Sequence, residues 1–338
     1  MIRTKTAIII GASAGIEIEM PGQRELLSKI AHGFDFQRLG SDLQTSEMQD
    51  FDTLFKKVKG EGDALREAAL RIRAGSRLSS SIHALLQQHG QDKYVAAAGK
   101  LAIAYYTLQA EHQSAMEAEP RDPGDMPFRG AENWLFQLGR MVVDGVSRSR
   151  AQNCFDNLHI VNFNTDRSIQ HYMPWVLHTG FGMPVTEAQA LCAEKLNVVQ
   201  PYGRAGRLEW QTGPETEAMW GDTNPKNLFK IAENIRTASE HLDDRQLKAS
   251  LIGGIANARR LLFIGFNFNP LDTSLLFQER LSHGPEALVA LGEGEQGRAD
   301  GIRRVLKNSV GIAPEQLLAM RFGPSWQMLA DNDLLIES

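Results

Sequence analysis

Three features of the sequence predict an α/β fold with a doubly wound parallel sheet and a large helical insertion. Short apolar runs alternate with stretches of helical periodicity, which is the pattern of strands joined by crossover helices. The first run, 7–10, ends in the small-residue turn 11–15, where backbone can approach a phosphate group closely. The stretch 34–155 has helical periodicity and few β-branched runs. We therefore expect a Rossmann-like domain formed by 1–33 and 156–338, with 34–155 as an all-helical insertion.

Each predicted strand is an apolar run that stops at a glycine or a polar residue. The runs are 7–10, one that starts at 158 and breaks at Asn164, 197–199, 261–264, 287–291 and 319–322. Helices are predicted where apolar residues recur every three or four positions. They span 24–32, 64–74, 79–89, 92–117, 131–149, 225–242, 244–258 and 297–308. Three more are a helix from 167 that Pro174 bends or breaks, one that follows Asp272 to about 281, and a last one after 322. A loop is predicted for 119–127.

Composition argues against several classes of function. Hydrophobic residues make up 42% and charged residues 23% of the chain, as in ordinary globular proteins. The formal net charge of −5 gives no signal for nucleic-acid binding. No apolar run has the length of a membrane span, so we expect a cytoplasmic protein that does not bind a membrane. Two cysteines, Cys154 and Cys192, are too few for a four-cysteine zinc site or a disulfide framework, and no metal site is predicted.

The turn after the first strand allows two interpretations. Residues 11–16, Gly-Ala-Ser-Ala-Gly-Ile, resemble the opening loop of short-chain dehydrogenases. That family needs a tyrosine with a lysine four positions later, and none of the five tyrosines has one. Glu17 also replaces the glycine expected at the helix start, and Pro21 would interrupt the helix. We therefore set the dehydrogenase interpretation aside.

Four short motifs in order resemble those of sirtuin-like proteins. Residues 11–21 look like the loop G-A-G-A-S-I-E-x-G-x-P, and Phe-Asn-Thr-Asp-Arg at 163–167 resembles the F-N-Y-D-R of bacterial members. Gln-Pro-Tyr-Gly at 200–203 falls where the family has a histidine-containing segment before a glycine. Leu-Phe-Ile-Gly-Phe-Asn at 262–267 resembles the family's strand that ends in G-F. Without the cysteines of the zinc ribbon, the chain most resembles the zinc-free bacterial branch, whose members hydrolyse nicotinamide adenine dinucleotide (NAD), often in anti-phage defence.

The resemblance implies a site for NAD or an ADP-ribose-like nucleotide. Asn164 would orient the nucleophile, Asp166 would support it, and Gln200 would stand at the position of the family's histidine, which acts as the general base. The implied nucleotide-binding residues are Gly11, Ala12, Ser13, Gly15, Ile16, Thr165, Tyr202, Gly203, Gly265, Phe266, Asn267, Gly292 and Glu293. The resemblance also implies a homo-oligomer and, for a defence enzyme, a partner protein of the defence system.

The residues at the histidine position leave the reaction open. Gln200 and the other candidate for that position, Tyr202, are poor bases, because an amide takes up no proton and a phenol is already protonated near neutral pH. An active enzyme would need another base, from the helical insertion or a neighbouring subunit. The alternatives are a regulatory module that binds the nucleotide without cleaving it, and a scaffold whose function lies in the insertion. The local interpretation of Asp166 is a helix cap, and that of Asn164 is the closing residue of a strand.

Overall fold

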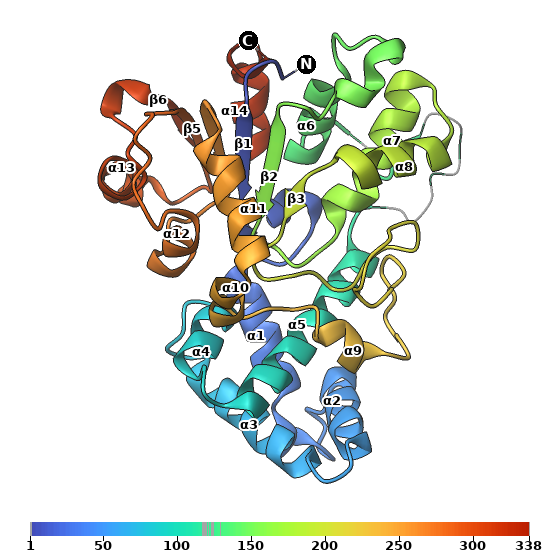
Figure 1. Cartoon of the computed structure of the whole chain (residues 1–338). Coiled ribbons are helices and arrows are strands. Elements are labelled where there is room, and N and C mark those ends of the chain that lie inside the picture. Colours follow the sequence, from blue (N-terminus) through green and yellow to red (C-terminus); the bar gives the residue numbers. More distant parts are fainter. Residues whose placement is uncertain (1, 117–119, 121, 123–124, 129, 338) are drawn as a thin grey trace.

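The structure, a computed structural model, describes residues 2–337 except 117–119, 121, 123, 124 and 129. Six parallel strands form one sheet in the order β3-β2-β1-β4-β5-β6. Their bounds are β1 Thr6–Ile10, β2 Leu158–Asn162, β3 Val198–Val199, β4 Arg260–Ile264, β5 Glu286–Leu291 and β6 Leu317–Phe322. This order is that of the Rossmann-like fold, which confirms the predicted fold class. The carboxyl ends of the strands point toward a bundle of helices at the other end of the molecule (Figure 1).

The centre of the sheet is apolar because helices cover both of its faces. All five residues of β1 are buried, and the strand pairs with β2 on one side and β4 on the other. Ile8 and Ile10 point to one face and Ala7 and Ile9 to the other, as the alternation of side chains along a strand requires. A continuous apolar run is typical of a strand that is buried on both faces, and this pattern predicts the strand at 7–10.

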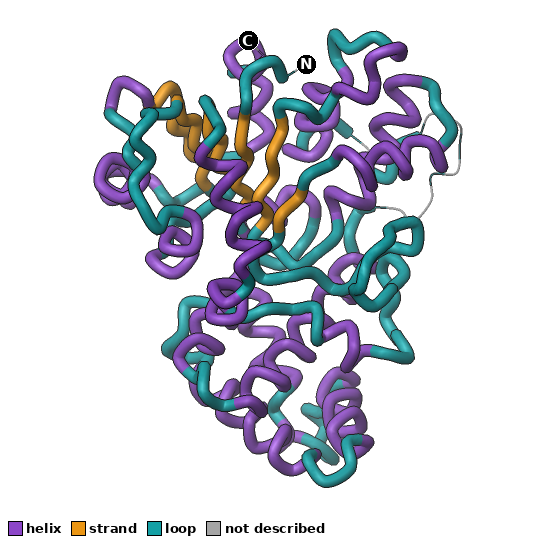
Figure 2. The backbone as a smooth tube through the Cα atoms, in the orientation of Figure 1, coloured by secondary structure: helices purple, strands orange, loops and turns teal. Residues whose placement is uncertain are grey.

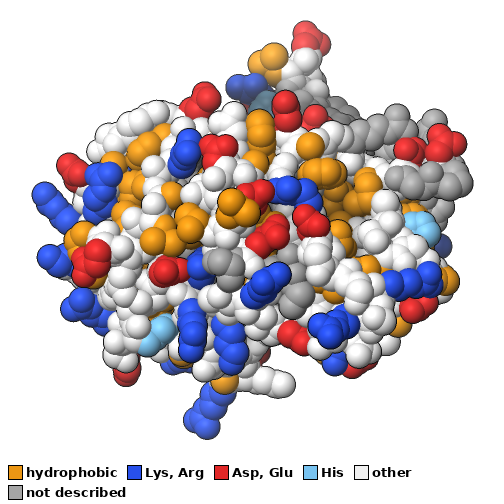
Figure 3. Space-filling view, turned by 90° about the horizontal axis from the view of Figure 1, so that it is seen from above, with side chains coloured by type: hydrophobic (Ala, Val, Ile, Leu, Met, Phe, Trp, Pro, Cys, Tyr) orange, Lys and Arg blue, Asp and Glu red, His pale blue; other side chains and the backbone are white. Residues whose placement is uncertain are grey.

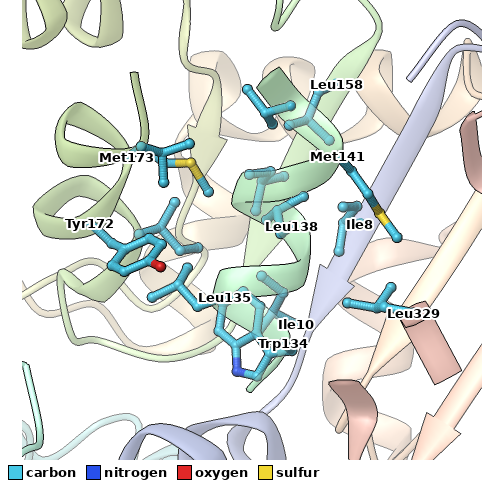
Figure 4. Packing of buried hydrophobic residues seen from close by; sticks show 14 of the residues in the cluster. Ile8, Ile10, Trp134, Leu135, Leu138, Met141, Leu158, Tyr172, Met173 and Leu329 are labelled. Atoms are coloured by element: carbon cyan, nitrogen blue, oxygen red, sulfur yellow. The ribbon is translucent and has the colours of Figure 1, made fainter. Parts of the chain in front are cut away.

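Helices pack on each face of this sheet (Figure 2). On the face of Ile8 lie α6 (Trp134–Val143), α7 (Ser168–Phe181), α8 (Val185–Lys195) and α14 (Ser325–Asp331), and Figure 4 shows Trp134, Leu138 and Met141 against β1. On the face of Ile9 lie α11 (Arg245–Ala256), α12 (Pro270–Leu276) and α13 (Ala299–Val305). The remaining helix of the carboxyl-terminal part is α15 (Asp333–Glu337).

A separate apolar core holds the helical bundle together. Its helices are α1 (Gln23–Gly33), α2 (Ser46–Lys57), α3 (Gly62–Gly75), α4 (Ile82–Gln88), α5 (Lys93–Gln113) and α9 (Leu228–Ala232). The long helix α5 is the centre of the bundle, and 13 of its 21 residues are buried. The bundle therefore recruits α1 from before residue 34 and α9 from after residue 155, whereas α6, inside 34–155, packs on the sheet.

Several helices differ from their predicted bounds. Helix α2 lies in a stretch for which no helix was predicted, and the predicted helix 225–242 is two helices, α9 and α10 (Ala238–Asp243). The second of these begins anew at Thr237, whose side chain forms a capping box with Glu240. Helix α7 continues through Pro174 rather than breaking there, because the residues on both sides of the proline are buried in the core. The helix after Asp272 ends at Leu276 rather than near 281.

The predictions for 92–117 and 119–127 fall partly outside the described residues. Within the described part, the first of these helices ends at Gln113. No described helix is both long and apolar enough to span a membrane. Lysine and arginine side chains are interspersed with aspartate and glutamate on the face shown in Figure 3, consistent with a chain of small net charge.

Candidate functional site

A cavity of about 50 Å³ lies where the carboxyl ends of β1 and β2 meet the helical bundle. The sheet domain lines it with residues of the segment after β1, which includes the 3₁₀ helix η1 (Ala12–Ile18), and with Phe163 and 164–166 after β2. The bundle lines it with residues 81–83 at the start of α4 and with Thr107 and Ala110 of α5. Of the predicted site residues, Ala12, Gly15, Asn164, Thr165 and Asp166 therefore line one cavity.

Asn164 connects the ends of the two central strands. Its side-chain Nδ2 donates to the backbone oxygen of Gly11 at 3.3 Å, and its backbone N–H donates to Asn162 Oδ1 at 3.0 Å. The side chain is partly exposed to the cavity, so the amide lies at the cavity wall. Closing a strand end and contacting a ligand are thus compatible roles for this residue.

Asp166 and Thr165 are more deeply buried than Asn164. The Asp166 carboxylate accepts hydrogen bonds from the backbone N–H of Ser168, at 3.0 Å, and from the Ser168 hydroxyl. Burial raises the pKa of this carboxyl, and the bonds from Ser168 oppose that shift. The hydroxyl groups of Thr165 and Thr107 are 2.9 Å apart, which ties the loop after β2 to α5 of the bundle.

Gln200 supports this loop from behind. Its Nε2 donates to the backbone oxygens of Asn164, at 2.8 Å, and Asp166, at 2.9 Å, while its Oε1 accepts from Gln170 Nε2 at 2.9 Å. The buried amide therefore uses both its donor and its acceptor to hold the backbone that carries Asn164. Gln200 is not among the residues that line the cavity, and its hydrogen bonds hold the backbone of two residues that do.

Tyr202 is held in a second buried arrangement. Its hydroxyl donates to Asp272 Oδ1 at 2.5 Å, and burial raises the pKa of the phenol. Burial also raises the pKa of Asp272. A phenol that already donates to a carboxylate is a poor proton acceptor. Gly203, with a φ of +72°, follows in a turn whose backbone touches Asn234, so its role here is conformational.

His83 is a residue of this site that the sequence does not predict. It is the second residue of α4, where the Ser81 hydroxyl caps the helix by accepting from the backbone N–H of Ala84 at 3.1 Å. Its imidazole lines the cavity and stacks on the ring of Tyr202, with ring centroids 3.7 Å apart and an interplanar angle of 9°. A single histidine inside a predicted helix carries no local signal of function. What places His83 in the site is its contact with Tyr202, a residue far away in the sequence, and no local pattern predicts that contact.

The predicted glycine turns lie against each other beside the cavity. A Cβ atom on Gly11 would be 2.4 Å from the backbone oxygen of Gly265, and one on Gly265 would be 2.2 Å from the backbone nitrogen of Ala14. Glycine at both positions allows this contact of backbone with backbone. Asn267 Nδ2 donates to Gln23 Oε1 at 3.0 Å, which joins the second turn to α1.

Several predicted nucleotide-binding residues lie outside the cavity lining. These are Gly11, Ser13, Ile16, Tyr202, Gly203, Gly265, Phe266, Asn267, Gly292 and Glu293. Ile16 is 64% exposed, whereas Phe266 is buried in the sheet core.

Glu17, in the 3₁₀ helix after β1, links two helices that pack on the sheet. Its carboxylate accepts from the backbone N–H groups of Trp134, at 3.1 Å, and Trp326, at 3.3 Å, at the starts of α6 and α14. Burial raises the pKa of Glu17, and these hydrogen bonds oppose the shift.

A buried ion pair fixes the loop of Asn164 to the bundle. Arg167 Nε donates to Glu111 Oε1 at 3.0 Å, and both side chains are fully buried. The guanidinium also donates to the backbone oxygens of Ala218, at 2.6 Å, and Met219, at 2.9 Å. The loop after β2, helix α5 and the segment around 218–221 are thus joined at one point.

Comparisons with protein families, with curated proteins and with solved structures give no match. Within the described part of the chain, no group of three or more histidine, cysteine, aspartate or glutamate side chains is arranged to hold a metal ion.

Proposed function

We propose that the chain binds NAD or a closely related nucleotide at this cavity and hydrolyses the bond between nicotinamide and ribose. The observation that carries the proposal is that Asn164 lines a cavity at the carboxyl edge of the parallel sheet, beside the glycine turn after β1. Nucleotides bind at this edge in Rossmann-like folds. The resemblance of 11–21, 163–167 and 262–267 to zinc-free sirtuin-like proteins supports NAD as the nucleotide, and anti-phage defence is the setting that it implies.

The role proposed for Asn164 follows from its hydrogen bonds. Nδ2 is anchored on Gly11, so the amide plane is oriented with respect to the glycine turn. An oriented amide can position a water molecule or a ribose hydroxyl next to the sugar carbon that is attacked. Gln200 donates to the backbone oxygen of the same residue, which restrains the backbone that carries the amide.

The volume of the cavity sets a condition for binding. About 50 Å³ accommodates one or two water molecules, whereas sites for small molecules typically measure roughly 300–1,000 Å³. Binding a nucleotide therefore requires the walls to separate. Residues 81–83 lie at the start of the short helix α4, so a shift of α4 away from the loop after β2 would enlarge the cavity.

Nicotinamide release tests the proposal directly. We expect the purified full chain to release nicotinamide from NAD, and Asn164→Ala to lower the rate by about 10²-fold through loss of positioning. Asn153→Ala is the matched control, because Asn153 is an exposed asparagine at the end of the 3₁₀ helix η3 (Arg148–Asn153), outside the cavity lining. Equal rates for the wild type and Asn164→Ala would refute hydrolysis at this site.

A second candidate function is binding of the nucleotide without hydrolysis. It is favoured by one observation, that Gln200 and Tyr202 are both committed to buried hydrogen bonds and neither can accept a proton. Calorimetry distinguishes the two functions: NAD that binds the wild type without release of nicotinamide supports the binding module, and no heat of binding with NAD or ADP-ribose counts against both.

A further inference from the structure

His83 has the surroundings of a functional side chain rather than of a packing residue. Its Nδ1 atom is buried and has no hydrogen-bond partner among the residues that the structure describes. A buried polar atom without a partner destabilises the fold, and an apolar side chain of similar shape would avoid that loss. His83 also lines the cavity, and a cavity-lining side chain with unused hydrogen-bonding capacity is suited to a ligand or a water molecule.

The orientation of the imidazole is fixed by the groups behind it. Tyr202 stacks on it in nearly parallel planes, and Tyr202 is itself anchored by its hydrogen bond to Asp272 and by an edge contact with Phe163 at a centroid distance of 5.8 Å. The stack therefore holds the imidazole, which comes from the bundle, in a fixed orientation against residues of the sheet core. A fixed ring is a requirement for efficient proton transfer.

His83 is uncharged, as a proton acceptor must be, but the burial that keeps it uncharged also makes it a weak base until a ligand binds. Burial lowers its pKa to about 3, so the imidazole is neutral at physiological pH and has a free lone pair. Asp166 is the other ionisable residue among the described residues that line the cavity, and Tyr202, which stacks on the imidazole, donates a hydrogen bond to Asp272. The negative charges of a bound pyrophosphate would favour the imidazolium form and raise that pKa toward neutrality.

We propose that His83, supplied by the helical bundle, is the proton acceptor of this site. The inference rests on the hydrolysis proposed above. A water oxygen forms a bond to the ribose carbon as the bond from that carbon to the nicotinamide nitrogen breaks. The electron pair of the broken bond leaves with nicotinamide, and the proton of the attacking water passes to an imidazole nitrogen of His83 and then to solvent.

The bundle therefore supplies one of the catalytic side chains of the proposed site. Asn164 comes from the sheet domain and His83 from α4, so the two groups act together only when the bundle sits on the carboxyl edge of the sheet. If α4 shifts to admit the nucleotide, it must return for His83 to act together with Asn164.

Substitutions at His83 in the full chain test the assignment. We expect His83→Ala and His83→Gln to lower kcat for nicotinamide release by about 10²–10⁴-fold, the usual effect of losing a general base. Added imidazole should restore part of the rate of His83→Ala, where it can enter the space left by the ring, and should not restore Asn164→Ala. His89→Ala is the matched control, because His89 ends the same helix and lies outside the cavity lining.

Three results would overturn the assignment, and they differ from failure of the proposed function. Unchanged release by His83→Ala, with Asn164→Ala inactive, would show that another group accepts the proton. Faster release by His83→Ala would show that the imidazole blocks the cavity. If Asp166→Asn is inactive and imidazole does not rescue His83→Ala, the carboxylate of Asp166 is the group that accepts the proton of the attacking water. Equal release by the wild type and Asn164→Ala would instead refute the hydrolysis and this inference together.

Discussion

Replacing Arg167 by methionine is expected to lower the free energy of unfolding by about 3–5 kcal/mol, the usual effect of leaving one partner of a buried ion pair unpaired. Arg167 and Glu111 are both fully buried, so removing the guanidinium leaves a buried carboxylate without its ion-pair partner. The substitution also removes the hydrogen bonds that the guanidinium donates to the backbone oxygens of Ala218 and Met219. Urea titration of the wild type and the variant measures the difference.

Two further variants separate charge from packing. The double variant Arg167→Met with Glu111→Gln should be more stable than Arg167→Met alone, because the unpaired charge is gone. Arg140→Met removes a half-exposed partner of Asp333, at an ion-pair distance of 3.2 Å, and should change stability by no more than about 1 kcal/mol. An Arg167→Met variant as stable as Arg140→Met would contradict the expected role of the buried pair.

The ion pair also bears on function, because it holds the loop of the candidate site. Arg167 directly follows 164–166, and its backbone N–H donates to the same Glu111 carboxylate at 3.1 Å. We infer that the pair sets the distance between the sheet edge and the bundle. The position of His83 relative to Asn164 therefore depends on contacts that neither residue makes itself.

Local sequence patterns were sufficient for the sheet and insufficient for the site. Apolar runs such as 7–10 specify buried parallel strands, and the glycine turn marks the edge where Asn164 lies. The sequence also suggested that a base could come from the helical region, yet nothing local distinguished His83. Its contact with Tyr202 depends on how the bundle docks on the sheet, and no periodicity encodes such docking.

The same limit applies to residues whose role is set by distant partners. Gln200 falls at the motif position where the sirtuin-like family has its histidine, but its side-chain amide donates hydrogen bonds to the backbone oxygens of Asn164 and Asp166. Pro174 predicts a bend or a break, and α7 continues through it because its neighbours are buried in the core. The contacts that decide both cases join residues far apart in the sequence.

Gly265→Ala is expected to disrupt both the fold and the site, whereas Gly292→Ala at the end of the neighbouring strand is expected to be tolerated. Gly265 has a φ of +59°, and an added Cβ would lie 2.2 Å from the backbone nitrogen of Ala14. We expect a loss of about 2–6 kcal/mol in the free energy of unfolding, from the strained backbone and the overlap together. At Gly292 an added Cβ meets no heavy atom of the described chain within 4 Å.

Gly11→Ala tests whether the contact between the two glycine turns accounts for the loss of stability expected in Gly265→Ala. A Cβ on Gly11 would lie 2.4 Å from the backbone oxygen of Gly265, so Gly11→Ala should also push the turns apart. Once one substitution has separated them, the second has less to displace, and the double variant should lose less stability than the two single losses added together. Weaker NAD binding by calorimetry should accompany the separation, because Asn164 is anchored on Gly11. Strict additivity of the two losses would show that the turns act independently, and the anchor of Asn164 would then not depend on their contact.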